Sequence, residues 1–216
     1  FQNLFLAGKC MSEVRSSQVI YDVEDRLLNM LKGLTGYDLG YSYTPFDLYS
    51  FITYRGNLYL VVKIRTQAVR IVAISWRDNF FTYDWLKQRV ESDESEFVRS
   101  EALRQIAIGW KQEPGILELL KQRVVSDESE DVRAVALEQI AIGWKQEPGI
   151  LELLKQRVES DESNYVRGEA VRQIAIGWKQ EPGILELLKQ RVESDENERV
   201  RGEAVRQIAS GWKQEP

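Results

Sequence analysis

The chain has 216 residues, 43% of them hydrophobic and 29% charged, with a formal net charge of -5 and a pI of about 5.1. This composition is sufficient for a hydrophobic core, and the negative balance gives the chain no overall attraction for polyanions. Histidine is absent and Cys10 is the only cysteine, which excludes an intramolecular disulfide, a cysteine-based metal site and the usual general base.

The apolar stretch 58–76 is the candidate for a membrane span, and Lys63, Arg65 and Arg70 interrupt it. We therefore expect a cytoplasmic chain that needs no cofactor. The chain opens on Phe1 rather than Met, which leaves open whether a segment precedes it.

The N-terminal residues predict a helical hairpin formed by 3–14 and 22–34, with Gly33 and Gly36 ending the second helix. The segment 37–59 follows, rich in tyrosine and phenylalanine, with glycine and proline that interrupt long helices. Two interpretations of this segment stay open. It packs over the apolar end of the region that follows, or it is a surface that binds a partner.

A repeat of 34 residues is the strongest pattern in the sequence, and five tryptophans mark it: Trp76, Trp110, Trp144, Trp178 and Trp212. A fixed period of this length predicts a solenoid in which neighbouring repeats cover each other. We assign residues 1–46 to an N-terminal segment and 47–216 to about five repeats, the first diverged and the last incomplete. The tryptophans are expected to form a packed column, with ligand stacking as the alternative.

Each repeat is predicted to contain two helices, and residues 97–110 show the first. Its apolar residues recur at helical spacing, which leaves Glu101, Arg104 and Gln105 outward, and Ser95 is positioned as the N-cap. The predicted buried residues are Val98, Ala102, Leu103, Ile106 and Ala107.

The second helix follows a break at "KQEPG", and Pro114 suits its first turn. Its predicted buried residues are Ile116, Leu117, Leu120 and Val124. No segment of the chain alternates between apolar and polar residues as a strand would, so the fold class is all-α.

An aspartate and an arginine six residues later recur in each full repeat: Asp93 with Arg99, Asp127 with Arg133, Asp161 with Arg167, and Asp195 with Arg201. This pattern over residues 64–216 resembles the HEAT repeat and its shorter relatives. The resemblance implies a right-handed α-solenoid in which these residues form a hydrogen-bonded ladder between repeats. Tyr59 stands where the first aspartate is expected, so the ladder should end at or before Arg65.

A more particular resemblance rests on "LFLAGKCMSEVR", "IRTQAVRIVAISW" and "VRGEAVRQIAIGWKQEPGILELLKQRV". These phrases look like the C-terminal region of bacterial NACHT-type signalling NTPases, familiar from cyanobacteria. The resemblance implies the sensor region of such a protein, although no phosphate-binding G-x-x-x-x-G-K-[ST] motif occurs here. A free-standing adaptor that binds proteins is the alternative.

Neither catalysis nor metal binding is indicated. Serine and threonine have no histidine partner, and the acidic runs "ESDESE" and "SDESED" lack the glycine and spacing of a calcium loop. We therefore predict no catalytic residues and no metal site.

Nucleic-acid binding is a further alternative, because some HEAT-like proteins hold duplex DNA on the concave face that their second helices line. The charges of these helices make it the less favoured one. Two adjoining rows of opposite charge lie on these helices, Lys87, Lys121, Lys155 and Lys189 beside Asp84, Glu118, Glu152 and Glu186. The rows largely cancel, whereas a phosphate backbone needs clustered positive charge.

Positions that vary between repeats suggest where a protein partner binds. They form three rows: Phe97, Asp131, Tyr165 and Arg199; Glu101, Val135, Glu169 and Glu203; Arg104, Glu138, Arg172 and Arg206. Spacings of four and three place the rows on one outward face of the first helices, with Phe97 and Tyr165 as aromatic anchors. Drift at exposed positions is the alternative.

The last first helix, 199–212, lacks a following "GILELLKQRV". We expect it to expose Val205 and Ile208 and to associate with another chain.

Overall fold

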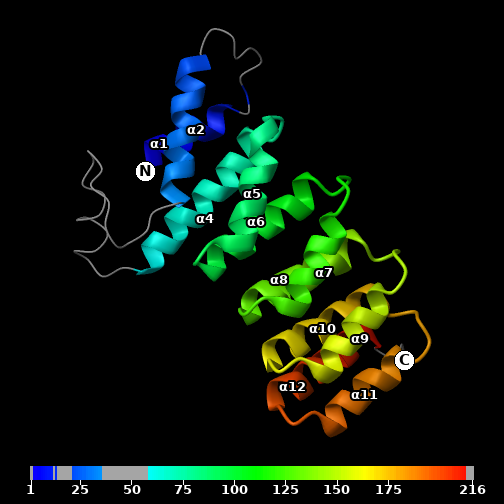
Figure 1. Ribbon diagram of the computed structural model, residues 1–216. Coiled ribbons are helices and arrows are strands. Elements are labelled where there is room, and N and C mark those ends of the chain that lie inside the picture. The colour runs from blue at the N-terminus through cyan, green and yellow to red at the C-terminus, as the bar shows by residue number, and fades with distance from the viewer. Residues whose placement is uncertain (1, 12, 14–20, 36–57, 213–216) are drawn as a thin grey trace. The chain divides into compact units, whose positions relative to one another are not determined.

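The computed structural model describes residues 2–11, 13, 21–35 and 58–212, and every regular element in them is an α-helix (Figure 1). The predicted all-α class is therefore confirmed. The chain divides into two compact units, residues 1–110 and 111–216. The proposed boundary at residues 46 and 47 lies outside the described residues, as does nearly all of the aromatic segment 37–59, and both remain predictions. No described helix is both long and apolar enough to cross a membrane.

The first unit is built around α4. Its helices are α1 (Gln2–Met11), α2 (Tyr21–Thr35), α4 (Leu58–Ser75), α5 (Phe80–Ser92) and α6 (Glu96–Gly109). The helices α1, α2 and α6 all contact α4, while α5 packs mainly on α6 (Figure 1). Since α1 and α2 also contact each other, the predicted N-terminal hairpin is confirmed. The second hairpin helix runs to Thr35, so Gly33 lies inside it instead of ending it.

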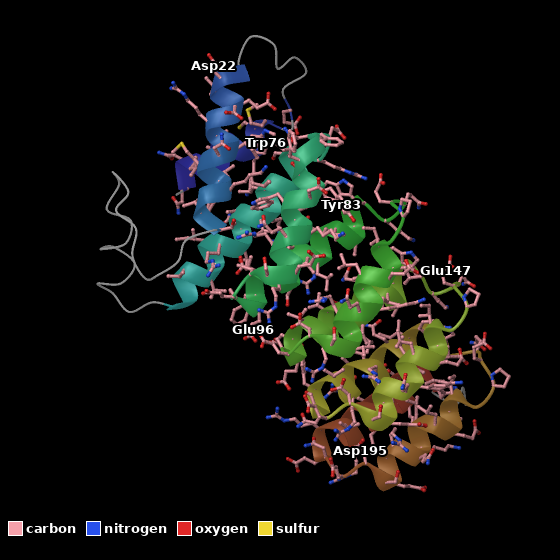
Figure 2. All side chains as sticks on the ribbon, in the orientation of Figure 1. Asp22, Trp76, Tyr83, Glu96, Glu147 and Asp195 are labelled. Carbon is pink, nitrogen blue, oxygen red and sulfur yellow. The ribbon has the colours of Figure 1, made fainter. Side chains whose placement is uncertain are left out.

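The core of this unit joins the hairpin to α4. Leu31 of α2 and Ala68 and Val72 of α4 are completely buried, together with Trp76, which Figure 2 labels and which is 3% exposed. Gly8 permits the close approach of α1, because a β-carbon there would lie 2.7 Å from a methyl group of Ile71. The hairpin therefore covers the apolar face of α4.

The second unit contains three first helices and three second helices. They are α7 (Ile116–Ser126), α8 (Glu130–Gly143), α9 (Ile150–Ser160), α10 (Asn164–Gly177), α11 (Ile184–Ser194) and α12 (Glu198–Gly211). The first helix α10 contacts both α8 and α12, and each second helix packs on the first helix that follows it (Figure 1). The predicted helix pairs are thus confirmed, with a second helix more closely joined to the next repeat than to its own.

Burial agrees with the predicted apolar spacing in the first helices: Val98, Ala102, Leu103, Ile106 and Ala107 are all buried. In α7 the prediction was partly wrong, because Leu119 is buried and Leu117 is only half-buried. The buried stripe of α7 follows positions i, i+3, i+4 and i+8 from Ile116, the usual pattern of a helix with one apolar face.

The turn between the two helices differs from the prediction at Pro114. The second helix α7 begins at Ile116, and Gly115 before it has a φ of 87°. In the next repeat the amide of Ile150 donates to the carbonyl of Glu147 at 3.4 Å, with Gly149 at a φ of 80°. This is a type II turn with proline second and glycine third. Pro114 therefore shapes the turn and lies outside the helix.

Capping also differs from the prediction. Ser95 is the N-cap of α6, but its side chain makes no capping hydrogen bond. The side chain of Asp93 accepts from the amide of Ser95 instead, at 2.9 Å. In α10 the equivalent Ser163 does accept from the amide of Tyr165, at 3.1 Å.

Candidate functional site

The repeated aspartates and arginines connect consecutive repeats. Nη1 of Arg133 donates to the carbonyl of Asp127 at 2.9 Å, and Nη2 donates to the carboxylate of Asp161 at 3.1 Å. Arg167 does the same one repeat later, binding the carbonyl of Asp161 at 2.9 Å and the carboxylate of Asp195 at 3.2 Å. The arginine thus binds the backbone of its own aspartate and the side chain of the next. Both arginines are about 6% exposed or less, so they serve the framework.

The first arginine of this series has a different backbone partner. Nη2 of Arg65 donates to the carboxylate of Asp93 at 2.8 Å and to the carbonyl of Thr35 at 3.0 Å. An aspartate at the position of Tyr59 is not needed to supply a backbone carbonyl, because Thr35, the last residue of α2, supplies it to Arg65. The hairpin is therefore hydrogen-bonded to the start of the series.

The tryptophans close the first helices and are covered to different degrees. Trp76 and Trp178 are buried, whereas Trp110, Trp144 and Trp212 are half-buried. In the second unit a lysine lies over each ring, with Lys111 at 5.6 Å from Trp144 and Lys145 at 5.8 Å from Trp178. These cation–π contacts occupy the ring faces, which favours packing over ligand stacking.

The first row of candidate partner-binding residues lies at the starts of the first helices and is accessible. Phe97 is 45% exposed and Tyr165 is 50% exposed. Arg199 is also exposed, and Asp131 is half-buried.

The second row is not on the outward face, contrary to the prediction for Glu101, which is 4% exposed. In the first unit Nε and Nη2 of Arg70 donate to its two carboxylate oxygens at 2.9 and 3.0 Å. Gln105 donates to it as well, at 2.8 Å. The hydrogen bond to Glu101 raises the pKa of Arg70. Glu101 is buried because α4 lies beside it and supplies a cation.

The second unit contains a related network among α8 and α10. Nη2 of Arg172 donates to Glu169 at 2.6 Å and reaches Glu138 of the preceding first helix at 3.5 Å. The hydrogen bond to Glu169 raises the pKa of Arg172. In α12, Arg206 pairs with Glu203 in the same way. Val135, Glu169 and Glu203 are half-buried.

The second and third rows therefore vary for a structural reason. Where one repeat carries Glu138 in place of an arginine, Arg172 of the next repeat binds it, so the substitution is compensated inside the framework. Arg104 similarly lies 3.6 Å from Glu101. The first row has no such explanation and is the better candidate for recognition.

Tyr165 of the first row has a perturbed acidity. Partial burial raises the pKa of its phenol, and the carboxylates of Asp131, Glu169 and Glu138 raise it further, against the opposing charge of Arg172. The phenol therefore stays protonated at neutral pH and can donate a hydrogen bond to a partner.

Sequence reasoning missed a fourth row on the same helix face. Ile74, Ile108, Ile142 and Ile176 are 58%, 65%, 68% and 62% exposed, although they recur at the repeat spacing. Phe97 and Ile108 lie on the same side of α6 about three turns apart, with the buried Glu101 between them. The sequence did contain a signal for this exposure. Ile108 follows the buried Ile106 by two residues, so the two side chains point to different sides of the helix.

A second missed feature is an exposed aromatic pair at the start of α5. Phe80 and Phe81 are 82% and 66% exposed, with ring centroids 5.4 Å apart. They occupy the positions at which the other repeats have proline and glycine, such as Pro114 and Gly115. Alignment of the repeats therefore shows this difference.

The charges of the second helices pair with one another. Lys87 lies 4.0 Å from Glu91, and Lys155 lies 3.9 Å from Glu152. Within the described part of the chain no three potential metal ligands gather.

Comparison with known proteins gives one family. Residues 83–175 and 147–210 match the family profile of HEAT repeats, together more than half of the chain. No curated protein and no solved structure matches the chain.

Proposed function

Since the chain belongs to the HEAT-repeat family, we propose that it is a non-catalytic scaffold that recognises a protein partner through the outward face of its first helices. We name this face the recognition face. Its residues in the first unit are Phe97, Ile74 and Ile108, and its residues in the second unit are Asp131, Tyr165, Arg199, Ile142 and Ile176.

The exposed isoleucine row is the observation that carries this proposal. Isoleucine side chains that are 58–68% exposed recur in the four first helices from Ile74 to Ile176, and each leaves most of its apolar surface in contact with water. Exposed apolar rows bordered by polar groups are typical of protein-binding surfaces. The first row adds aromatic and charged groups that differ between repeats, which allows selection among partners.

We further propose that this scaffold is the sensor region of a NACHT-type signalling NTPase. The three phrase-like resemblances in the sequence support this assignment, and a free-standing adaptor is the alternative. The open reading frame that contains the chain tests it: an upstream phosphate-binding NTPase supports the sensor assignment, and a frame with no such domain contradicts it.

A protein partner is favoured over nucleic acid by the charges of the second helices. Lys87 lies near Glu91 and Lys155 lies near Glu152, so part of the positive row is neutralised within its own helices. A duplex would need uncompensated lysines and arginines along the groove.

The recognition face is tested by capture from a lysate of the source cells. The bait is the chain with Phe97→Ala and Tyr165→Ala, beside the unchanged chain, with bound proteins identified by mass spectrometry. Both side chains are about half exposed, so folding should be unchanged by circular dichroism. We expect the specific partner to be lost.

Phe80→Ala with Phe81→Ala is the matched control, because it also removes two exposed aromatic rings. We expect this variant to keep the partner. Retention by the first double variant and loss by the second would move the binding surface from the first helices to the start of α5.

A further inference from the structure

The exposed isoleucines of the second unit have a cation beside them in each repeat. Ile142 and Ile176 lie one residue before the glycines that end α8 and α10. A lysine from the preceding turn lies against each of these glycines. Cε of Lys111 is 3.7 Å from the place that a β-carbon on Gly143 would take, and Cδ of Lys145 is 4.0 Å from the equivalent place at the end of α10. Each isoleucine is therefore next to a residue that a lysine contacts.

These lysines carry a charge that the fold does not neutralise. Lys111 and Lys145 lie over the rings of Trp144 and Trp178, at 5.6 and 5.8 Å from the centroids. A neutral ring holds the ammonium group in place, but the group keeps its net charge and has N–H donors left for a carboxylate. In the described residues neither lysine forms an ion pair, in contrast to Lys155, which pairs with a glutamate of its own helix. The ends of α8 and α10 thus present an apolar side chain beside an unpaired positive charge.

The first unit, taken by itself, shows the same combination. Arg77 holds the position of the lysines and donates to the carbonyl of Gly109, the residue after the exposed Ile108. Since a cation lies near an exposed isoleucine in both units, the combination is a property of the repeat.

The spacing of the first helices determines which partner contacts two isoleucines at once. The helices α8 and α10 pack directly on each other, and packed helices lie about 8–10 Å apart. A partner helix that crosses them rises about 10.5 Å in seven residues, so apolar residues seven apart reach both Ile142 and Ile176. An extended segment is less suitable, because the main-chain groups of α8 and α10 are bonded within each helix and do not pair with its backbone.

A partner protein is favoured over an anionic membrane by the glutamates of the same turns. Glu113 and Glu147 are exposed two residues after Lys111 and Lys145. A flat anionic surface would meet these carboxylates together with the lysines. A helix about 10 Å wide is narrow enough to contact the isoleucines and lysines alone.

We propose that the second unit binds an acidic amphipathic helix of a partner protein across the ends of α8 and α10. Apolar residues seven apart on this helix contact Ile142 and Ile176, and its carboxylates contact Lys111 and Lys145. This inference rests on the proposed function, because it names the class of partner that the recognition face accepts.

Fluorescence anisotropy with the full chain tests the proposal. The probe is a labelled 21-residue peptide made of three copies of the heptad LEAAEAA, which places a leucine at every seventh residue and glutamates beside it. A peptide of three LKAAKAA heptads is the control with opposite charge. We expect the acidic peptide to bind at least about tenfold more tightly than the basic one, and to bind more weakly as salt is added.

The apolar contact is tested by Ile142→Ser with Ile176→Ser. This double variant should weaken binding of the acidic peptide by at least about fivefold through lost apolar contact. Val125→Ser with Val205→Ser is the matched control, because it also removes two exposed apolar side chains from the second unit. We expect the control to bind within about twofold of the unchanged chain, and all four positions are exposed enough for folding to be kept.

The charge contact is tested by Lys111→Glu with Lys145→Glu, which should weaken binding of the acidic peptide by at least about tenfold. Lys87→Glu with Lys189→Glu is the control of equal charge change, because both lysines are exposed on second helices. We expect this control to stay within about twofold of the unchanged chain. If circular dichroism shows that the first variant is unfolded, Lys111→Gln with Lys145→Gln replaces it.

Three results would overturn the proposal: no binding of the acidic peptide, equal affinity for the two peptides, or equal weakening by test and control variants. Binding to vesicles of phosphatidylcholine and phosphatidylserine that is lost in the isoleucine variant would also overturn it, in favour of a membrane surface.

Failure of this inference is distinguishable from failure of the proposed function. Tyr165 lies eleven residues before Ile176 in α10, about 16 Å along the helix, so the peptide and the Tyr165 substitution test different ends of the face. If the peptide does not bind but Phe97→Ala with Tyr165→Ala still loses a captured partner, only the acidic-helix proposal is wrong. If both tests fail, the proposed function is wrong as well.

Discussion

Equivalent residues are buried differently at the two ends of the repeat array. Val69 and Val72 of α4 are completely buried, whereas Val205 and Ile208, which hold the same repeat positions in α12, are 50% exposed and half-buried. The exposure of Val205 agrees with the sequence prediction, and association through this surface remains a prediction. The helix α4 is therefore covered more completely than α12.

The difference has a physical origin in α1 and α2. These helices share no repeat motif with the rest of the chain, yet Leu31 and Phe5 complete the core over α4. Thr35 also gives Arg65 the carbonyl that an aspartate gives the other arginines. At the other end, the hydrogen bonds of Arg201 go to the carbonyls of Asp195 and Glu196. A helix pair at the end of a repeat array has an apolar face that no neighbouring repeat covers, so other residues must cover it.

The largest loss of stability is expected for an aspartate that binds the arginine of the preceding repeat. Asp161→Ala removes the carboxylate that Arg133 binds at 3.1 Å and leaves a buried cation without that partner. We expect the free energy of unfolding to fall by up to about 3–5 kcal/mol. Urea denaturation measures this, and Glu159→Ala is the neighbouring control, because its side chain is exposed on α9. Equal midpoints for the two variants would show that the ladder does not stabilise the array.

The next prediction compares the two terminal arginines. Arg65→Ala removes hydrogen bonds to Asp93 and Thr35 and should cost about 1.5–3 kcal/mol. Arg201→Ala should cost less, under about 1 kcal/mol, since the bonds of this arginine go only to nearby carbonyls in the described chain. Thermal unfolding of both variants gives the order, and a greater loss for Arg201→Ala would refute the role assigned to the hairpin.

Truncation of one valine position in two repeats tests the packing difference directly. Val171 is completely buried, so Val171→Ala should lower the free energy of unfolding by about 2 kcal/mol through lost burial and a cavity. Val205→Ala should change it by less than about 0.5 kcal/mol. Guanidinium denaturation measures both values. Similar losses would mean that the end of the array is packed in solution as tightly as its interior.

The smallest effects concern two glycines in the same pair of repeats. Gly183→Ala places a β-carbon at a φ of 84° and should destabilise the chain by about 1–2 kcal/mol. Gly168 lies within α10 with no atom within 4 Å of an added β-carbon, so Gly168→Ala should stabilise it by about 0.5–1 kcal/mol. The preceding repeat already carries Ala134 at this position. Differential scanning calorimetry should show melting temperatures that move in opposite directions.

The helix pairs were predictable because their signals are local. Apolar residues at helical spacing placed Val98 and Ile106 in the core without knowledge of the neighbouring repeats. The repeat period also indicated which elements must be equivalent. The start of the second helix was placed two residues too early, because Pro114 suits both a first helical turn and the turn that precedes it.

The candidate surface was harder to predict, because its residues face partners from other repeats. Polarity placed Glu101 outward, whereas its carboxylate is buried and is bound by Arg70, 31 residues earlier. The sequence analysis included Ile108 neither in the core nor in the candidate surface, although it is 65% exposed. The burial of Glu101 could not be predicted from one helix considered alone, whereas the exposure of Ile108 could.

The sequence by itself determined the repeat length, the two helices of each repeat and the residues that must be buried, because backbone geometry and apolar spacing act over a few residues. Tertiary structure decided which polar residues on the first helices remain exposed, because that depends on the charge supplied by the adjacent helix. It also decided how closely α1 packs on α4, since Gly8 lies against Ile71 and Leu31 in the folded chain. The spacing of apolar residues determines which side of a helix is buried, and contacts between distant segments determine which residues cover that side.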